Sequence, residues 1–237
     1  MLTSQGLTGA SARRERGRQE MRVAILEAAA RIMETDGIDG LTIRAVAEAV
    51  AYSPGALYEY FDSKEAILKA LYFGGADGLG AQCERAVASL PPESSAIDAI
   101  VALGRAYRAY ALDHPDLYRL VFGGWTTPPL AAAVECEEEE SRGGFGTLAD
   151  VASRGIAEGT LVDLPPAVIA VTTWATVHGF VSLELTGHLT GGDGPGMPPA
   201  SPEVGRQTRD QLFEALLRMA LYGFAREEKR MAAEPAA

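Results

Sequence analysis

The sequence predicts an all-α protein made of two successive helical domains. Apolar residues recur at intervals of three and four along most of the 237 residues, which is the period of one face of a helix. We find no alternation of apolar and polar residues of the kind that marks a half-buried strand, and no internal repeat. Breaks such as Pro91-Pro92 and Pro165-Pro166 separate the periodic stretches, as expected for helices joined by short loops.

The first three helices are predicted from apolar spacing and from capping residues. Their expected ranges are 18–36, 43–50 and 54–61. Gly37 can supply the left-handed residue that ends the first helix, and Thr42 is a suitable N-cap for the second. Ser53 can cap the third helix, with Pro54 at its first position, where the missing N–H group is tolerated.

The remaining periodic stretches predict seven further helices. Their expected ranges are 66–90, 97–112, 117–122, 128–140, 143–157, 165–189 and 202–230. The predicted domain plan is a basic arm at 1–17, a first domain at 18–65, a second domain at 66–230 and a tail at 231–237. The Gly- and Pro-rich segment 190–202 is expected to be a loop.

Composition is that of a globular protein, with 47% apolar and 22% charged residues and a formal net charge of −11. Two cysteines, Cys83 and Cys136, are too few for a disulfide framework or a zinc site, and the start of the chain lacks an apolar leader. We therefore expect a cytoplasmic protein. The apolar stretch 167–183 contains several polar residues, so no transmembrane helix and no membrane partner are expected.

Charge is distributed unevenly along the chain. Residues 1–31 contain six arginines and three glutamates, a net charge of +3, whereas residues 76–237 have a net charge of −10. A polyanion could approach only the N-terminal end. An arginine-rich segment alone fits a flexible, solvated arm as well as a nucleic-acid contact. The helices that follow are needed to distinguish between these two interpretations.

The spacing of the first three helices is typical of a helix-turn-helix, whose last helix lies in the DNA major groove. The stretch 40–48, Gly-Leu-Thr-Ile-Arg-Ala-Val-Ala-Glu, together with 53–65, resembles the DNA-binding domain of tetracycline-repressor (TetR) family regulators. The resemblance implies a helix-turn-helix DNA-binding domain followed by a helical ligand-binding and dimerisation domain. It also implies a homodimeric repressor that binds a palindromic operator on double-stranded DNA and is released by a small molecule of unknown identity.

The candidate DNA-binding residues come from chain chemistry and from the resemblance. Small residues at the start of the third helix would let its backbone approach base edges; they are Ser53, Pro54, Gly55 and Ala56. The resemblance assigns Tyr58 and Tyr60 to backbone or base contacts, Lys64 to a phosphate, and Thr42 with Arg44 to the flank of the groove. Leu57 and Phe61 are expected in the core.

The chain departs from the family pattern at the turn and in the third helix. Ala51 stands where Gly is usual and Tyr52 where an aliphatic residue is usual, so either the turn is strained or Tyr52 itself reaches DNA. Glu59 would repel phosphate, but it could accept a hydrogen bond from cytosine N4. Simple solvent exposure is an equally good interpretation of Tyr52 and Glu59.

The second domain is less diagnostic. Trp174 and His178, with Gly179, resemble a Trp-x-x-x-His-Gly signature of one TetR subgroup, and they lie one helical turn apart, where they could line a cavity. The candidate ligand-binding residues are Tyr107, Tyr110, Phe122, Trp125, Trp174 and His178. Ordinary core packing produces the same aromatic spacing. Helices 165–189 and 202–230 are expected to form a four-helix interface with those of a second copy.

Enzyme functions find little support in the sequence. Nucleophile-elbow, Walker, dinucleotide-binding and His-Glu-x-x-His motifs are all missing, and the run Glu137–Glu140 fits a solvated helix face better than a metal site. We expect no cofactor and no metal. Two alternatives stay open: a small-molecule-binding interaction protein of the same fold without DNA binding, and a helical enzyme that uses His178 as a base.

Overall fold

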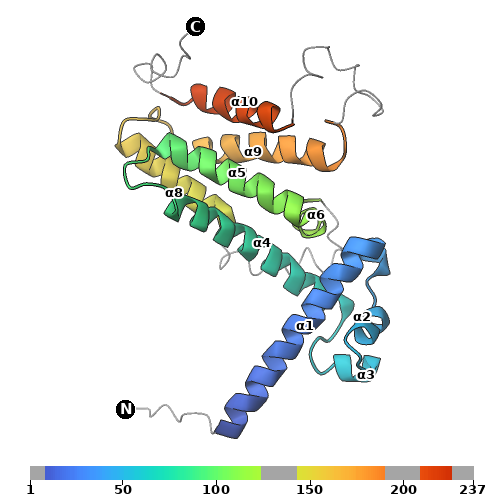
Figure 1. Ribbon diagram of the computed structural model, residues 1–237. Coiled ribbons are helices and arrows are strands. Elements are labelled where there is room, and N and C mark those ends of the chain that lie inside the picture. The colour runs from blue at the N-terminus through green and yellow to red at the C-terminus, as the bar shows by residue number, and fades with distance from the viewer. Residues whose placement is uncertain (1–8, 124–142, 190–208, 226–237) are drawn as a thin grey trace, which may run out of the picture. The chain divides into compact units, whose positions relative to one another are not determined.

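The computed structural model describes residues 9–123, 143–189 and 209–225, and these residues are almost entirely helical (Figure 1). The helices are α1 (Gly9–Gly40), α2 (Ile43–Ala49), α3 (Pro54–Leu57), α4 (Lys64–Ala88), α5 (Ala96–Asp113), α6 (Pro115–Phe122), α8 (Gly143–Ala157), α9 (Pro166–Leu185) and α10 (Arg209–Tyr222). Among the described residues no strand forms, and a single antiparallel bridge joins Leu161 to Ala225. The predicted all-α class is confirmed.

The chain folds into two compact units whose boundary falls inside α4 rather than at the expected residue 65. The described residues of the first unit are 9–75 and 116–123, and those of the second are 76–115, 143–189 and 209–225. Helix α6 returns to the first unit because Leu120 is fully buried in the core of that unit. The expected helix 128–140, the loop 190–202 and the tail 231–237 lie outside the described residues.

The core of the first unit gathers apolar residues from α1, α2, α3, α4 and α6. Its buried members are Ile25, Ala29, Met33, Leu41, Val46, Ala47, Leu57, Phe61, Ile67, Leu68, Leu71 and Leu120. Leu57 and Phe61 are buried here, as predicted from their position behind the exposed start of α3. This cluster holds α2 and α3 against the longer helices, since neither short helix would be stable alone.

Helix α1 begins earlier than predicted and bends where it was expected to end. It starts at Gly9 instead of Arg18, so the second half of the expected arm is helical. Good helix formers, chiefly Ala and Arg, occupy this segment, and Arg13 donates from Nε to the carbonyl of Gly9 at 3.2 Å. At Gly37 the backbone has φ 71°, which kinks the helix before its last turn.

Helix α3 is shorter than predicted, because its hydrogen bonds tighten after one turn. The amide groups of Tyr60 and Phe61 both donate to the carbonyl of Leu57, at 2.9 and 3.1 Å. The chain from Tyr58 to Tyr60 is therefore a turn rather than the second turn of a helix. This geometry directs Phe61 into the core.

In the second unit, α9 packs against α5, α8 and α10. A capping box starts α5, with Ser95 and Asp98 each bonding the backbone of the other. By length and composition alone, α9 is the one helix in the described part of the chain that could cross a bilayer, a test that core helices also pass. Its buried face includes Ile169, Thr173 and Val177.

Arginines of α5 connect the helices of the second unit. Arg108 binds both carboxylate oxygens of Glu184 on α9 at 2.7 Å and Asp210 on α10 at 2.8 Å. The Arg108 and Glu184 side chains are only 13% and 3% exposed. Arg105, which is more exposed, forms a bidentate pair with Glu214 of α10 at 2.7 Å. Both arginines therefore tie α10 to α5, and Arg108 also ties α9 to α5.

Candidate nucleic-acid interface

The start of α3 presents a row of small residues to solvent. Ser53, Pro54 and Gly55 are exposed and Ala56 is partly exposed, while Leu57 behind them is buried. The Ser53 hydroxyl accepts a hydrogen bond from the Ala56 amide at 3.1 Å, so the predicted cap is confirmed. Because a Cβ added to Gly55 would have only the Ser53 hydroxyl within 4 Å, the space in front of Gly55 is open.

Helix α2 and the following turn hold the start of α3 in place. The Thr42 hydroxyl accepts from the Ala45 amide at 3.1 Å, which confirms the predicted cap, and both Thr42 and Arg44 are exposed. Ala51 has φ 57°, in the left-handed region that favours glycine, and its amide donates to Glu48 at 3.1 Å. The turn is therefore strained at Ala51, which is one of the two possibilities raised by the sequence.

Three tyrosines near α3 differ in how exposed their side chains are. Tyr58 is 52% exposed and Tyr52 is 39% exposed. Tyr60 is partly buried, and its ring lies edge-on to that of Tyr52 with 6.4 Å between centroids. Tyr58 is therefore the most accessible of the three for a contact with DNA. Glu59 is exposed beside it.

Two arginines of α1 fasten the turn after α3, a role that the sequence analysis missed. Arg18 donates from Nη2 to the Glu59 carbonyl at 3.0 Å, and Arg22 donates from Nη1 to the Tyr60 carbonyl. The Arg22 guanidinium also lies 4.1 Å from the centroid of the Phe61 ring. Their spacing of four residues indicates a shared helix face, but only the fold shows what that face meets.

Lys64, the expected phosphate ligand, is partly buried and donates to the carbonyl of Ile38 at 2.9 Å. This bond links the first residue of α4 to the end of α1. An ammonium group has three donors, so one bond leaves capacity for a phosphate. The structure therefore gives Lys64 a supporting role in the fold in addition to any role at DNA.

A polar cluster lies among the helices of the second unit. The Tyr107 hydroxyl is 2.9 Å from His178 Nδ1, and Trp174 donates from Nε1 to that hydroxyl at 3.4 Å. Ser182 lies 3.4 Å from the other ring nitrogen of His178. Burial lowers the pKa of His178, which favours the neutral imidazole. The buried hydroxyl of Thr173 has no hydrogen-bond partner within the described residues.

The other aromatic ligand candidates are not brought to this cluster in the described residues. Tyr110 packs against His114 with ring centroids 4.8 Å apart, and a Cβ on Gly78 of α4 would be 2.8 Å from the Tyr110 hydroxyl. Phe122 lies on α6, in the first unit, against Tyr118. Trp125 lies outside the described residues.

Within the described ranges, no cluster of three or more His, Cys, Asp or Glu side chains could hold a metal ion. The acidic run Glu137–Glu140 is outside those ranges. Cys83 is a buried free thiol, and burial together with Glu84 raises its pKa to about 11. A thiol of this kind is unreactive at neutral pH.

Proteins of known structure or description resemble this chain over different shares of its length. A protein of unknown function from Rhodococcus sp. RHA1 has a solved structure that covers 86% of this chain and 95% of its own, with 29% identity and a TM-score of 0.70. An uncharacterized HTH-type transcriptional regulator of Mycobacterium tuberculosis is 29% identical over 166 residues, which is 70% of this chain and 71% of that protein. The HTH-type transcriptional repressor KstR2 of Rhodococcus jostii is 28% identical over 110 residues, 44% of this chain and 54% of that protein.

Two family models match the chain, one in its N-terminal part and one in its C-terminal part. Residues 25–71 match the model described as bacterial regulatory proteins, tetR family. Residues 100–219 match the tetracyclin repressor-like C-terminal domain. The first match contains the capped α2, the strained turn and the exposed start of α3, and the second contains the Tyr107–His178 cluster. The chain therefore belongs to the TetR family of helix-turn-helix transcriptional regulators.

Proposed function

We propose that this regulator is a homodimeric repressor in which each subunit inserts the start of α3 into the major groove of a palindromic operator. The observation that carries the proposal is the exposed row from Ser53 to Gly55, held rigidly by its cap and by the core residue Leu57 behind it. Its small side chains allow the backbone to reach base edges. Thr42, Arg44 and Tyr58 stand exposed around this row, and Tyr60 and Lys64 support it from partly buried positions.

Substitution at Gly55 tests this assignment without disturbing the fold. Because the space beyond Gly55 is open, Gly55→Leu is expected to keep the thermal stability of the wild type. The leucine would hold the helix away from the base edges, and we expect at least a tenfold loss of operator affinity. Gly55→Ala is the matched control, with a smaller loss. The operator is obtained first, by selecting bound duplexes from a random pool at low salt.

Selection also tests the alternative without DNA binding. Enrichment of an inverted repeat supports a dimer on a palindrome, since the symmetry of the site mirrors the symmetry of the protein. Folded protein that enriches no duplex would contradict the proposal and favour a small-molecule-binding interaction protein. Because the proposed partner is DNA, we also propose a cytoplasmic location, and no catalytic step is part of the proposed mechanism.

Dimerisation is assigned to the outer faces of α9 and α10. Both carry large apolar side chains at helical spacing that stay exposed in the single chain; they are Val168, Val171, Leu183, Met219 and Tyr222. Met219 is 77% exposed, which is unusual for an apolar residue without a partner. We expect Val171→Asp to shift a dimer toward monomers in sedimentation velocity. Val23→Asp, an exposed valine of α1, serves as the control.

Effector binding is assigned to the region around Tyr107, Trp174 and His178. The cluster lies at the edge of the apolar core, with Tyr107 buried, His178 partly buried and Trp174 36% exposed. Neutral hydrogen-bonding groups beside apolar side chains are typical of sites that orient a small molecule. The unpartnered hydroxyl of Thr173 adds a polar group that a bound molecule could satisfy. Compounds that release operator from the wild type are expected to act more weakly on His178→Phe and Thr173→Val, with unliganded operator affinity unchanged.

Release requires that the effector prefer one conformation over another. An effector that bound the DNA-competent and DNA-incompetent forms equally would change nothing, however tight its binding. Helix α4 contributes residues to both units and is the element we assign to transmission. If variants with mutated α4 residues still release the operator when the effector binds, with the wild-type ratio of affinities, the assignment is contradicted.

A further inference from the structure

The helix-turn-helix segment itself is acidic, which creates an electrostatic problem for a DNA-binding surface. Residues 42–62 contain one basic side chain, Arg44, and three acidic ones, Glu48, Glu59 and Asp62, and all four are exposed. Duplex DNA carries one negative charge per about 1.7 Å of its axis. The inference rests on the proposed function: if this segment enters an operator, cations elsewhere in the protein offset the repulsion.

The arginines in the first half of α1 divide into two groups. Arg18 and Arg22 are committed to the carbonyls of Glu59 and Tyr60, so they fasten the turn after α3. The part of α1 before them, residues 9–17, holds three arginines and one glutamate, a net charge of +2. Within the described residues, Arg14 and Arg16 have no ion-pair or hydrogen-bond partner, and both are exposed.

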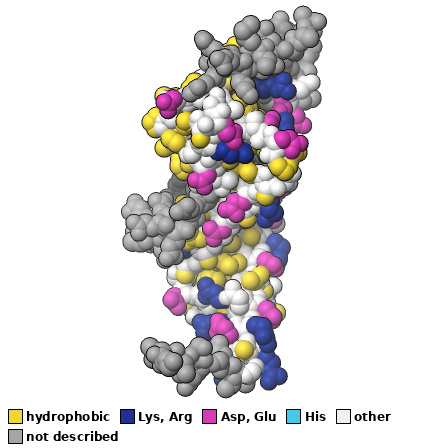
Figure 2. Space-filling model, turned by 90° about the vertical axis from the view of Figure 1, so that its left-hand side faces the viewer, with side chains coloured by type: hydrophobic (Ala, Val, Ile, Leu, Met, Phe, Trp, Pro, Cys, Tyr) yellow, Lys and Arg dark blue, Asp and Glu magenta, His cyan; other side chains and the backbone are white. Residues whose placement is uncertain are grey.

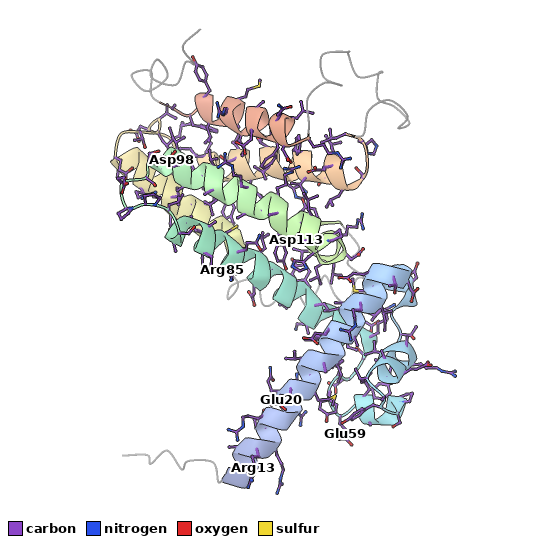
Figure 3. All side chains as sticks on the ribbon, in the orientation of Figure 1. Arg13, Glu20, Glu59, Arg85, Asp98 and Asp113 are labelled. Atoms are coloured by element: carbon purple, nitrogen blue, oxygen red, sulfur yellow. The ribbon has the colours of Figure 1, made fainter. Side chains whose placement is uncertain are left out.

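The geometry of α1 places Arg14 of this second group in line with the arginines that hold the turn after α3, and Arg13 and Arg16 lie on the other sides of the same helical turns. Arg14 lies four residues before Arg18, on the same helix face and roughly 6 Å farther along the axis. Because Arg18 donates to the Glu59 carbonyl, the row of arginines at positions 22, 18 and 14 on α1 extends beyond the turn after α3. Figure 3 shows Arg13 on the end of α1 that runs on beyond Glu59, and basic side chains line the start of α1 in Figure 2.

We propose that residues 9–17 form a second DNA-contacting element, in which Arg13, Arg14 and Arg16 bind backbone phosphates beside the groove that α3 enters. This element is a continuous extension of α1 rather than a loose arm. The contacts of Arg18 and Arg22 set its direction before DNA arrives, so little conformational entropy is lost on binding. Phosphate contacts strengthen binding without reading the sequence.

The test compares the salt dependence of operator binding in the full-length protein. For Arg13→Ala/Arg14→Ala/Arg16→Ala we expect the slope of log affinity against log salt to become shallower by about 2 to 3. Affinity at physiological salt should fall more than tenfold, equally for the operator and for a random duplex. Arg31→Ala, which removes an exposed arginine on the same helix after Arg22, is the control and should keep the wild-type slope.

A second variant separates a helical element from a flexible basic arm. Glu15→Pro keeps all three arginines and removes one negative charge, but it breaks the helix before Gly17. Weaker operator binding by this variant supports the proposal. Wild-type affinity in this variant, or the wild-type salt slope in the triple variant, overturns it. Either result would be obtained with wild-type protein that binds its operator, so the proposed function would still stand.

Discussion

The two units use the cations that connect their helices in different ways. In the DNA-binding unit, Arg18, Arg22 and Lys64 donate to main-chain carbonyls. In the second unit, Arg105 and Arg108 bind carboxylates on α9 and α10. A carbonyl accepts a hydrogen bond without cancelling the charge, whereas a carboxylate neutralises its partner. The first unit therefore keeps the positive charge of these side chains near the surface proposed to bind DNA, whereas the second unit neutralises the charge of both arginines.

The two kinds of contact also differ in how much stability is lost when the cation is removed. Loss of a cation from a carbonyl leaves an unsatisfied but neutral group, while loss of a cation from a buried carboxylate leaves a bare charge. Glu184, at 3% exposure, is the clearest example of the second case. Stability changes should therefore be larger when the anchors of the second unit are removed.

The largest effect is expected for Arg108→Met. It would leave Glu184 buried without its cation and lower the free energy of unfolding by about 3 to 5 kcal/mol. Urea denaturation followed by circular dichroism measures the change. Arg105→Ala, which removes a more exposed pair, should change stability by less than about 1 kcal/mol. If Arg108→Met/Glu184→Leu is no more stable than Arg108→Met, lost packing rather than bare charge is responsible.

A smaller loss is expected for Arg22→Ala. The variant loses the bond to the Tyr60 carbonyl and the contact with the Phe61 ring, about 2 kcal/mol in sum. Because the turn after α3 would loosen, operator affinity should fall as well, which binding by fluorescence anisotropy measures. An unchanged affinity would show that the turn holds its shape without this anchor. Arg31→Ala is again the control on the same helix.

A stabilising change of about 1 kcal/mol is expected for Ala51→Gly, because glycine adopts the left-handed conformation without steric strain. Thermal denaturation detects it as a higher midpoint. The control is Ala49→Gly inside α2, where the same replacement should destabilise by about 0.5 to 1 kcal/mol. Equal shifts at both positions would contradict an origin in the positive φ of Ala51.

The smallest effect is a pH dependence confined to the second unit. Burial lowers the pKa of His178 in the folded state, so the unfolded chain takes up a proton first as pH falls. Stability from the neutral ring is present at pH 7 and above and is lost below about pH 6.5, by a fraction of the one-proton limit of about 1.4 kcal/mol per pH unit. His178→Gln should flatten this part of the pH profile in urea denaturation. A steeper profile would indicate that the ring is charged in the folded protein.

Local chemistry explains why the first unit was predicted in detail. The caps at Thr42 and Ser53, and the strain at Ala51, all involve residues within a few positions of one another. The helical spacing likewise predicted that Leu57 and Phe61 face inward. The early start of α1 and the short α3 were missed, because weak propensities and tightening hydrogen bonds decide them.

The sequence by itself determined the helical class, the capped helix-turn-helix and the family, since these depend on residues that are neighbours along the chain. Only the tertiary structure decided which acceptor each long cation reaches, because that depends on the helix packed against it. Arg18 meets Glu59 across 41 positions, and Tyr107 meets His178 across 71. An arginine in a sequence can bind phosphate, carbonyl or carboxylate, and the fold selects among them by distance and burial.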